Sequence, residues 1–294
     1  MNKKKINTAK YIDKLMTVIF YATGVFFLAL LFALAGYIII NGILSFDIKY
    51  LQFNSKGIGN QLFDTIYLVF LSLVISTPLG VTAGIYMSEY AKKNKVTDFI
   101  RVSIEALSSL PSLVVGLFML FLFILVLDIR RSLFVGSVAV SILSVPLITS
   151  TTEDALKSLP EEYKQGSMGL GATHWQTIGK VLLPACVPRI ITGIILAAGR
   201  GFGEAAALLF TTGQATVIKW TQWDITSLKC PLNPFRPAET LSLLIWSMKT
   251  EAIRPDKTQV ANVASAFLVI LVLGFSLLAR YISNRINKKV QGGK

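Results

Sequence analysis

Residues 152–212 read TEDALKSLPEEYKQGSMGLGATHWQTIGKVLLPACVPRIITGIILAAGRGFGEAAALLFTT, and this stretch decides the fold. Its second part, residues 190–210, is apolar and long enough to cross a bilayer, which takes about 20 helical residues. Its first part is punctuated by Pro160, Pro184 and several glycines, and it alternates apolar with charged residues. That pattern is typical of short helices lying at the membrane face. The stretch therefore predicts a surface loop followed by a membrane-spanning helix.

The composition indicates an integral membrane protein. Of the 294 residues, 53% are hydrophobic and only 15% are charged, whereas soluble domains carry roughly 25% charged residues. The formal net charge is +13, but the basic residues fall in short segments between apolar runs. Such segments are signals of membrane topology, and no nucleic-acid-binding module is visible.

Six apolar segments predict six transmembrane helices, so the expected fold class is an all-α integral membrane protein. Their approximate bounds are 15–40, 61–87, 103–127, 133–149, 190–210 and 260–278. The connecting and terminal segments on one side hold eighteen Lys and Arg residues, and those on the other side hold ten. By the positive-inside rule, we expect both termini and the loop 153–184 to lie in the cytoplasm.

The chain divides most simply around one membrane domain. We expect residues 1–60 to supply a basic cytoplasmic tail, a retained first transmembrane helix and an outer segment. Residues 61–280 form the expected membrane domain, with the surface loop at about 153–184, and residues 281–294 form a second basic cytoplasmic tail. In the outer segment 213–258, Leu241, Leu244, Ile245 and Met248 repeat at helical spacing, which predicts a short helix packed on the spans.

Catalytic and metal-binding motifs are missing from the sequence. The pair Gly179-Lys180 is followed by Val181, so it is not a phosphate-binding loop of the Walker A type. A single histidine, His174, and two cysteines expected to be too far apart for a disulfide leave no metal cluster and no nucleophile–base pair. We expect no cofactor, no metal and no enzyme activity. A separate ATPase or an ion gradient must then drive any uphill transport, and the large inner loop favours the ATPase.

Two charged residues, Arg200 and Glu204, lie within the fifth apolar segment, where ionisable groups are costly and often functional. They are four residues apart, hence on one face of a continuous helix. One interpretation is a structural ion pair. The other is a path for an anion, in which Arg200 supplies a planar set of donors and Glu204 neutralises it when no anion is bound. The residues alone favour neither interpretation. Gly203 leaves room beside Arg200 or admits a neighbouring helix, and Thr211 is a further candidate donor.

The segment 153–184 resembles the cytoplasmic coupling loop of binding-protein-dependent ABC importer permeases. The signature of that loop is EAA, three residues, GA, and LP about a dozen residues later. Here Gly171-Ala172 and Leu183-Pro184 keep the last two parts, and Gln165-Gly166-Ser167 replaces EAA. Four further segments are similar to the phosphate-specific permeases of the PstA family, and the last is the most specific. They are GVTAGIYMSEYA at 80–91, LSSLPSLVVGLF at 107–118, GATHWQTIGKVLLPACVPRIITGIILA at 171–197 and GRGFGEAAALLFT at 199–211.

The resemblance implies the type I ABC importer permease (MetI-like) fold and import of inorganic phosphate across the cytoplasmic membrane. It implies a homologous PstC-like permease, a PstB-like ATPase dimer and an external PstS-like phosphate-binding protein as partners, and it favours the anion path. The expected substrate-path residues are Arg200, Gly203, Glu204 and Thr211. The expected residues of the ATPase-coupling loop are Tyr163, Gln165, Gly166, Met168, Gly171, Ala172, Leu183 and Pro184, with Gly171 ending a helix in the left-handed conformation.

Three alternatives remain open at this point. The first is a permease for another oxyanion such as molybdate or sulfate. The second is a secondary carrier or channel that needs no ATPase, and the third is an integral membrane enzyme. The missing catalytic constellation argues against the enzyme, and one acidic residue in the fifth segment is little support for the ion relay of a gradient-driven carrier.

Overall fold

The computed structural model describes residues 3–54, 57–92, 94–251 and 255–291, and all regular structure in these residues is helical. The α-helices are α1 (Lys3–Leu44), α2 (Gly59–Ile85), α3 (Lys95–Ser109), α4 (Ser112–Met119), α5 (Leu133–Lys157), α6 (Glu161–Gly169), α7 (His174–Thr177), α8 (Leu183–Gly203), α9 (Ala206–Thr211), α10 (Leu241–Thr250) and α11 (Lys257–Gln291). A 3₁₀-helix, η1 (Ile48–Leu51), follows α1, and three π-helical turns are η2 (Tyr86–Tyr90), η3 (Leu120–Val126) and η4 (Ile178–Leu182).

Five of the described helical segments are long and apolar enough to cross a membrane, and there are six if a bent pair of helices is counted as one span. The five are Lys10–Leu44, Gly59–Tyr90, Leu133–Lys157, His174–Gly203 and Lys257–Arg285. The bent pair is α3 with α4 and η3. The structure thus confirms the all-α membrane fold.

The third predicted span, residues 103–127, is not one continuous helix. The chain bends by 100° between α3 and the helical segment Ser112–Val126, because Pro111 lacks an N–H and disfavours helical geometry at Leu110, which is extended. Helix α3 is amphipathic, with Lys95, Asp98 and Arg101 in its first half.

The fifth span was also predicted with the wrong bounds. Helix α8 begins at Leu183 rather than at residue 190, and it ends at Gly203 rather than continuing to residue 210. Glu204 has an extended backbone, with φ −69° and ψ 128°, and α9 starts two residues later. Gly201 and Gly203 weaken the helix before the break, since glycine costs about 1 kcal/mol in a helix interior.

Helices α2 and α5 form the centre of the bundle through small side chains. A Cβ atom added at Gly84 would lie 2.6 Å from the Cβ of Thr152, and one added at Gly80 would lie 2.7 Å from the Cβ of Ile148. About two helical turns further along, the Ser141 hydroxyl donates to the carbonyl oxygen of Ser72 at 3.0 Å. Such small residues let two helix backbones approach closely, as is common in membrane proteins.

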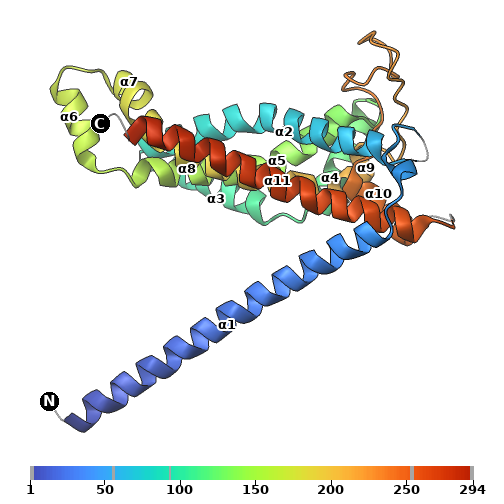
Figure 1. Ribbon diagram of the computed structural model, residues 1–294. Coiled ribbons are helices and arrows are strands. Elements are labelled where there is room, and N and C mark those ends of the chain that lie inside the picture. Colours follow the sequence, from blue (N-terminus) through green and yellow to red (C-terminus); the bar gives the residue numbers. More distant parts are fainter. Residues whose placement is uncertain (1–2, 55–56, 93, 252–254, 292–294) are drawn as a thin grey trace.

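The ends of the bundle carry different structures (Figure 1). Helices α6 and α7 lie at one end, near the C-terminal end of α11, and the segment 213–240 projects from the opposite end. The predicted helix in the outer segment is present as α10, and its Leu241 and Leu244 pack with Val260 and Val263 of α11. Helix α1 extends away from the bundle and meets α11 only near its own C-terminal end (Figure 1), where Gly42 contacts Ala266.

Candidate functional site

The first candidate surface is the apolar face of α6 and α7. Tyr163, Met168 and Trp175 are exposed, and 92% of Leu170 is open to solvent. These residues stand on a short two-helix unit whose turn depends on Gly171. This glycine has φ +87°, as predicted, and the Ala172 N–H donates to the carbonyl oxygen of Ser167 at 3.3 Å. Exposed apolar side chains gathered on one projecting loop are typical of a docking surface for another protein.

The remaining predicted loop residues occupy two environments. Gln165 and Gly166 are exposed on α6, and a Cβ atom added at Gly166 would meet no atom within 4 Å. Leu183 and Pro184 instead form the first turn of α8, and Leu183 packs against the apolar cluster beneath the loop. The structure therefore separates an outward-facing α6–α7 surface from the helix that carries it.

Two lysines of the loop, Lys157 and Lys164, form ion pairs with nearly buried carboxylates. The Lys157 ammonium contacts the Glu153 carboxylate at 2.6 Å, and Arg101 of α3 reaches the same oxygen at 2.8 Å. The Lys164 ammonium contacts Glu89 at 2.7 Å. Both lysines are thus paired with carboxylates whose side chains are at most 9% exposed.

The second candidate surface is the face of α8 that the rest of the chain leaves uncovered. Thr192, Leu196, Arg200 and Gly203 are exposed along this face, at spacings that place them in one row. Arg200 stands in the last turn of α8, where a cation interacts favourably with the helix dipole. None of the ion pairs among the described residues involves Arg200. Arg200 is therefore exposed and lies outside the ion pairs of the described residues.

The expected juxtaposition of Arg200 with Glu204 does not occur, because α8 ends between them. Glu204 is buried, and its carboxylate accepts a hydrogen bond from the Ala207 N–H at 3.0 Å. Its carbonyl oxygen accepts one from the Ser242 hydroxyl at 2.5 Å. Thr211 is buried too, and its hydroxyl donates to the Ala207 carbonyl at 2.9 Å. Both residues hold α9 in place instead of facing the row that contains Arg200.

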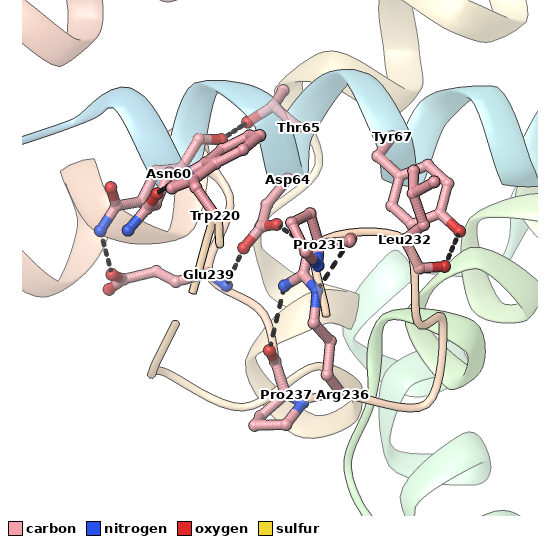
Figure 2. A network of polar contacts seen from close by, with 11 residues as sticks. Asn60, Asp64, Thr65, Tyr67, Trp220, Pro231, Leu232, Arg236, Pro237 and Glu239 are labelled. Atoms are coloured by element: carbon pink, nitrogen blue, oxygen red, sulfur yellow. Dashed lines mark hydrogen bonds and ion pairs between the residues drawn. The ribbon is translucent and has the colours of Figure 1, made fainter. Parts of the chain in front are cut away.

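A buried polar network at the opposite end of the bundle was missed by the sequence analysis (Figure 2). Asp64 of α2 pairs with Arg236 at 2.5 Å, and both side chains are fully buried. The guanidinium also donates to the carbonyl oxygens of Pro231 and Pro237 at 3.1 and 3.3 Å. Nearly all its donors are thus used, so this pair anchors the segment 213–240 to α2.

Further contacts extend the network along the first turns of α2. The Gln61 amide donates to the Glu239 carboxylate at 3.0 Å, and the Trp220 indole donates to the Asn60 side chain at 2.9 Å. Burial raises the pKa of the Glu239 carboxyl above its ordinary value. The sequence signal for this network was an aspartate inside an otherwise apolar span, which usually has an interior partner.

The described residues contain no group of three or more His, Cys, Asp or Glu side chains that could hold a metal ion. Cys186 and Cys230 are both buried and both free.

The chain is similar in sequence and in fold to membrane components of known transport systems. The family model for "binding-protein-dependent transport system inner membrane component" matches residues 76–292. A probable ABC transporter permease protein, YqgI of Bacillus subtilis (strain 168), is 44% identical over 288 residues, which are 96% of this chain and 98% of that protein. The phosphate transport system permease protein PstA of Xylella fastidiosa (strain 9a5c) is 34% identical over 65% of this chain and 68% of its own length. A solved structure of the MetNI methionine ABC transporter in an inward-facing conformation superposes with a TM-score of 0.58 and 19% identity, covering 79% of this chain and 94% of that one.

Proposed function

We propose that this chain, which belongs to the family of binding-protein-dependent transport system inner membrane components, carries inorganic phosphate into the cell. Membership of the family makes the chain the membrane-embedded permease of an ABC importer, a transport component with the MetI-like fold. The proposal adds the substrate, the partners and the orientation. The observation that carries it is Arg200, which is exposed on the uncovered face of α8 and has no ion-pair partner in the part of the chain that the structure describes.

The chemistry of Arg200 suits an oxyanion. A guanidinium within an apolar span is costly unless an anion or a partner group balances it, and the nearest predicted counter-ion, Glu204, turns toward α9. Arginine stays protonated and offers several N–H donors in one plane, which match the oxygens of phosphate. Gly203, three residues further, leaves open space beside it. In this proposal Glu204 and Thr211 support the path by fixing α9, and they do not touch the anion.

The similarity to PstA proteins supports phosphate rather than another oxyanion. It also supports a homologous permease as the partner that faces the uncovered row of α8, so that the path lies between the two subunits. A phosphate-binding protein at the outer face would deliver the substrate. We therefore place the translocation path outside the fully buried Asp64–Arg236 network, which is closed to solutes.

The α6–α7 surface completes the proposal as the docking site of a separate ATPase dimer. An amphipathic helix that lays its apolar side chains into a groove is a common mode of protein recognition, and Tyr163, Met168, Leu170 and Trp175 are the exposed apolar side chains there. ATP binding and hydrolysis in that partner would move α6 and α7, and the movement would reach the spans.

The orientation follows from the distribution of charge. The bias of Lys and Arg toward the segments at the α6–α7 end supports a cytoplasmic position for that end and for both termini. The position of α1 apart from the bundle supports the division of residues 1–60 from a membrane domain at 61–280, with 281–294 as the final tail.

The test is uptake of radiolabelled phosphate by liposomes that contain the complex purified through this chain, with the external binding protein added. We expect uptake that requires enclosed ATP and persists in a large excess of sulfate or molybdate. Suppression of uptake by either competitor would assign the importer to that oxyanion. Uptake by the chain alone, without ATP and without an ATPase, would replace the proposal with a secondary carrier.

A further inference from the structure

Glu89 occupies an unusual position at the end of the second span. It lies in η2, the π-helical turn that follows α2, and only 8% of its side chain is exposed. One carboxylate oxygen, Oε2, lies 2.7 Å from the Lys164 ammonium of α6 and 3.2 Å from Nε2 of His174 in α7. The other oxygen lies 3.2 Å from the Ser88 hydroxyl. A single side chain of the span therefore joins both helices of the docking unit.

Helices α6 and α7 form one unit because hydrogen bonds connect the two helices and cap the start of α7. The Ser167 and Thr177 hydroxyls lie 3.0 Å apart and link α6 to the last residue of α7. Thr173 and Gln176 form a reciprocal cap at the start of α7, which satisfies two N–H groups that the helix itself leaves open. A displacement of α6 by a bound partner would therefore carry α7 with it.

Glu89 is the main polar link between this unit and the spans. Among the described residues, no side chain outside 158–182 other than Glu89 forms a hydrogen bond or an ion pair with α6 or α7. The rest of the attachment is apolar, since Ile178 and Leu182 pack with Ile85 of α2 beneath the loop. Apolar packing is non-directional, whereas a charge-assisted bond fixes both distance and direction.

The surroundings of Glu89 leave room for movement. A cavity of about 180 Å³ adjoins the carboxylate, and its walls include Lys157, Lys164 and Leu182. The π-helical turn places Glu89 out of the regular α2 register, and such turns often mark functional positions in helices. A movement of the unit would thus act on a locally irregular end of α2 beside empty space.

From these contacts we infer that Glu89 is a positioning residue for transport, which transmits movement of the α6–α7 unit to α2. The inference rests on the proposed docking of an ATPase at this unit. Helix α2 packs along α5 through Gly80 and Gly84, so a pull on Glu89 displaces the central helix pair of the bundle. Without the carboxylate, the unit still packs and still binds its partner, but its movement is no longer fixed to that of α2.

The test compares Glu89→Gln and Lys164→Met with Glu105→Gln and Lys92→Met in the purified importer complex with its ATPase. The two control positions carry the same charges at exposed sites. We expect the first pair to assemble and to retain at least half of the ATPase rate, while uptake per ATP hydrolysed falls at least fivefold. The control pair should stay within twofold of the wild type. The reversed pair Glu89→Lys with Lys164→Glu should recover part of the coupling, which a merely structural defect would not allow.

A second readout does not depend on the substrate. Hydrogen exchange is measured with and without a non-hydrolysable ATP analogue. In the wild type we expect the analogue to change protection in both 161–177 and 80–90. In Glu89→Gln the change in 161–177 should persist and that in 80–90 should be lost. Equal changes in both proteins, or an unaltered uptake per ATP, would overturn the inference. Absence of phosphate uptake by the wild type would contradict the proposed substrate instead, and the exchange result would still decide the role of Glu89.

Discussion

Charged side chains of the helix bundle fall into two kinds, a buried ion pair and an exposed cation. Asp64 and Arg236 are fully buried and paired. Their attraction in a low-dielectric interior offsets a large desolvation cost only because the guanidinium also binds two backbone carbonyls. Arg200 is exposed and has no carboxylate partner among the described residues. The first pair organises the structure, and the exposed Arg200 is the cation to which we assign a transient ligand.

Glu239 gives a prediction about pH. Burial, with a contribution from the nearby Asp64, raises the pKa of its carboxyl above the ordinary value of 4.5. The folded state then holds the proton to higher pH than the unfolded state does, so the free energy of unfolding decreases as the pH rises above about 4.5. Glu239→Gln removes this decrease in the free energy of unfolding, because the amide does not ionise. The amide oxygen can still accept the hydrogen bond from Gln61. We expect its thermal midpoint to exceed that of the wild type at pH 7.5, with the difference shrinking toward pH 4.5.

The measurement is the unfolding midpoint of both proteins in detergent across that pH range. An exposed acid, Glu105→Gln, serves as the control and should shift the midpoint little at any pH. A wild type that is more stable than Glu239→Gln at neutral pH would show that the carboxylate is ionised and satisfied in the folded state.

The sequence located Arg200 and the glycine at the turn of the loop, but it misplaced Glu204. Helical spacing put Glu204 on the same face as Arg200, and that inference fails where a helix ends. The competing bond is local: the Glu204 carboxylate caps the Ala207 N–H three residues on, and such side-chain bonds to the backbone terminate helices. The role of Glu89 was not predictable, because its partner Lys164 is 75 residues away in sequence.

At the level of elements, close packing of α2 on α5 leads to a prediction about glycine. Gly84→Ala places a methyl group 2.6 Å from Thr152 Cβ and 2.8 Å from the Thr149 carbonyl oxygen. Overpacking of this kind costs about 1–3 kcal/mol, so we expect the unfolding midpoint of the complex to fall by several degrees. The matched substitution Gly166→Ala lies within α6 in open space and should leave the midpoint unchanged or slightly raised.

The thermal unfolding midpoints of the two variants, measured in detergent, check this prediction. Equal midpoints would mean that α2 and α5 separate easily, and the bundle centre described above would then be wrong. Hydropathy predicted the five continuous spans and the apolar segment of the bent pair, whereas the bend at Pro111 and the break after Gly203 were not predicted. Hydropathy averages over a window and does not register a single residue that removes a backbone donor or caps the next helix.

For the whole molecule, the sequence predicted which segments are apolar and the side to which basic residues are biased, because both are properties of local composition. It did not predict how the segment 213–240 folds. That segment is held by Asp64 and Asn60 of α2, which contact residues 160 or more positions away. Contacts of that separation leave no periodic pattern. The two ends of the bundle thus differ in structure. The segment 213–240 covers the end away from α6 and α7, and the α6–α7 unit presents an exposed apolar surface at the other end.

The central claim is that an anion passes along the uncovered face of α8 under the influence of Arg200. The direct measurement is the initial rate of ATP-dependent phosphate uptake by liposomes containing the assembled complex, with Arg200→Ala, Arg200→Lys and the exposed control Arg130→Ala. We predict at least a tenfold loss for Arg200→Ala, a smaller loss for Arg200→Lys, which keeps the charge without the planar donors, and a rate within twofold of the wild type for Arg130→Ala. A wild-type uptake rate in a fully assembled Arg200→Ala complex would contradict the account.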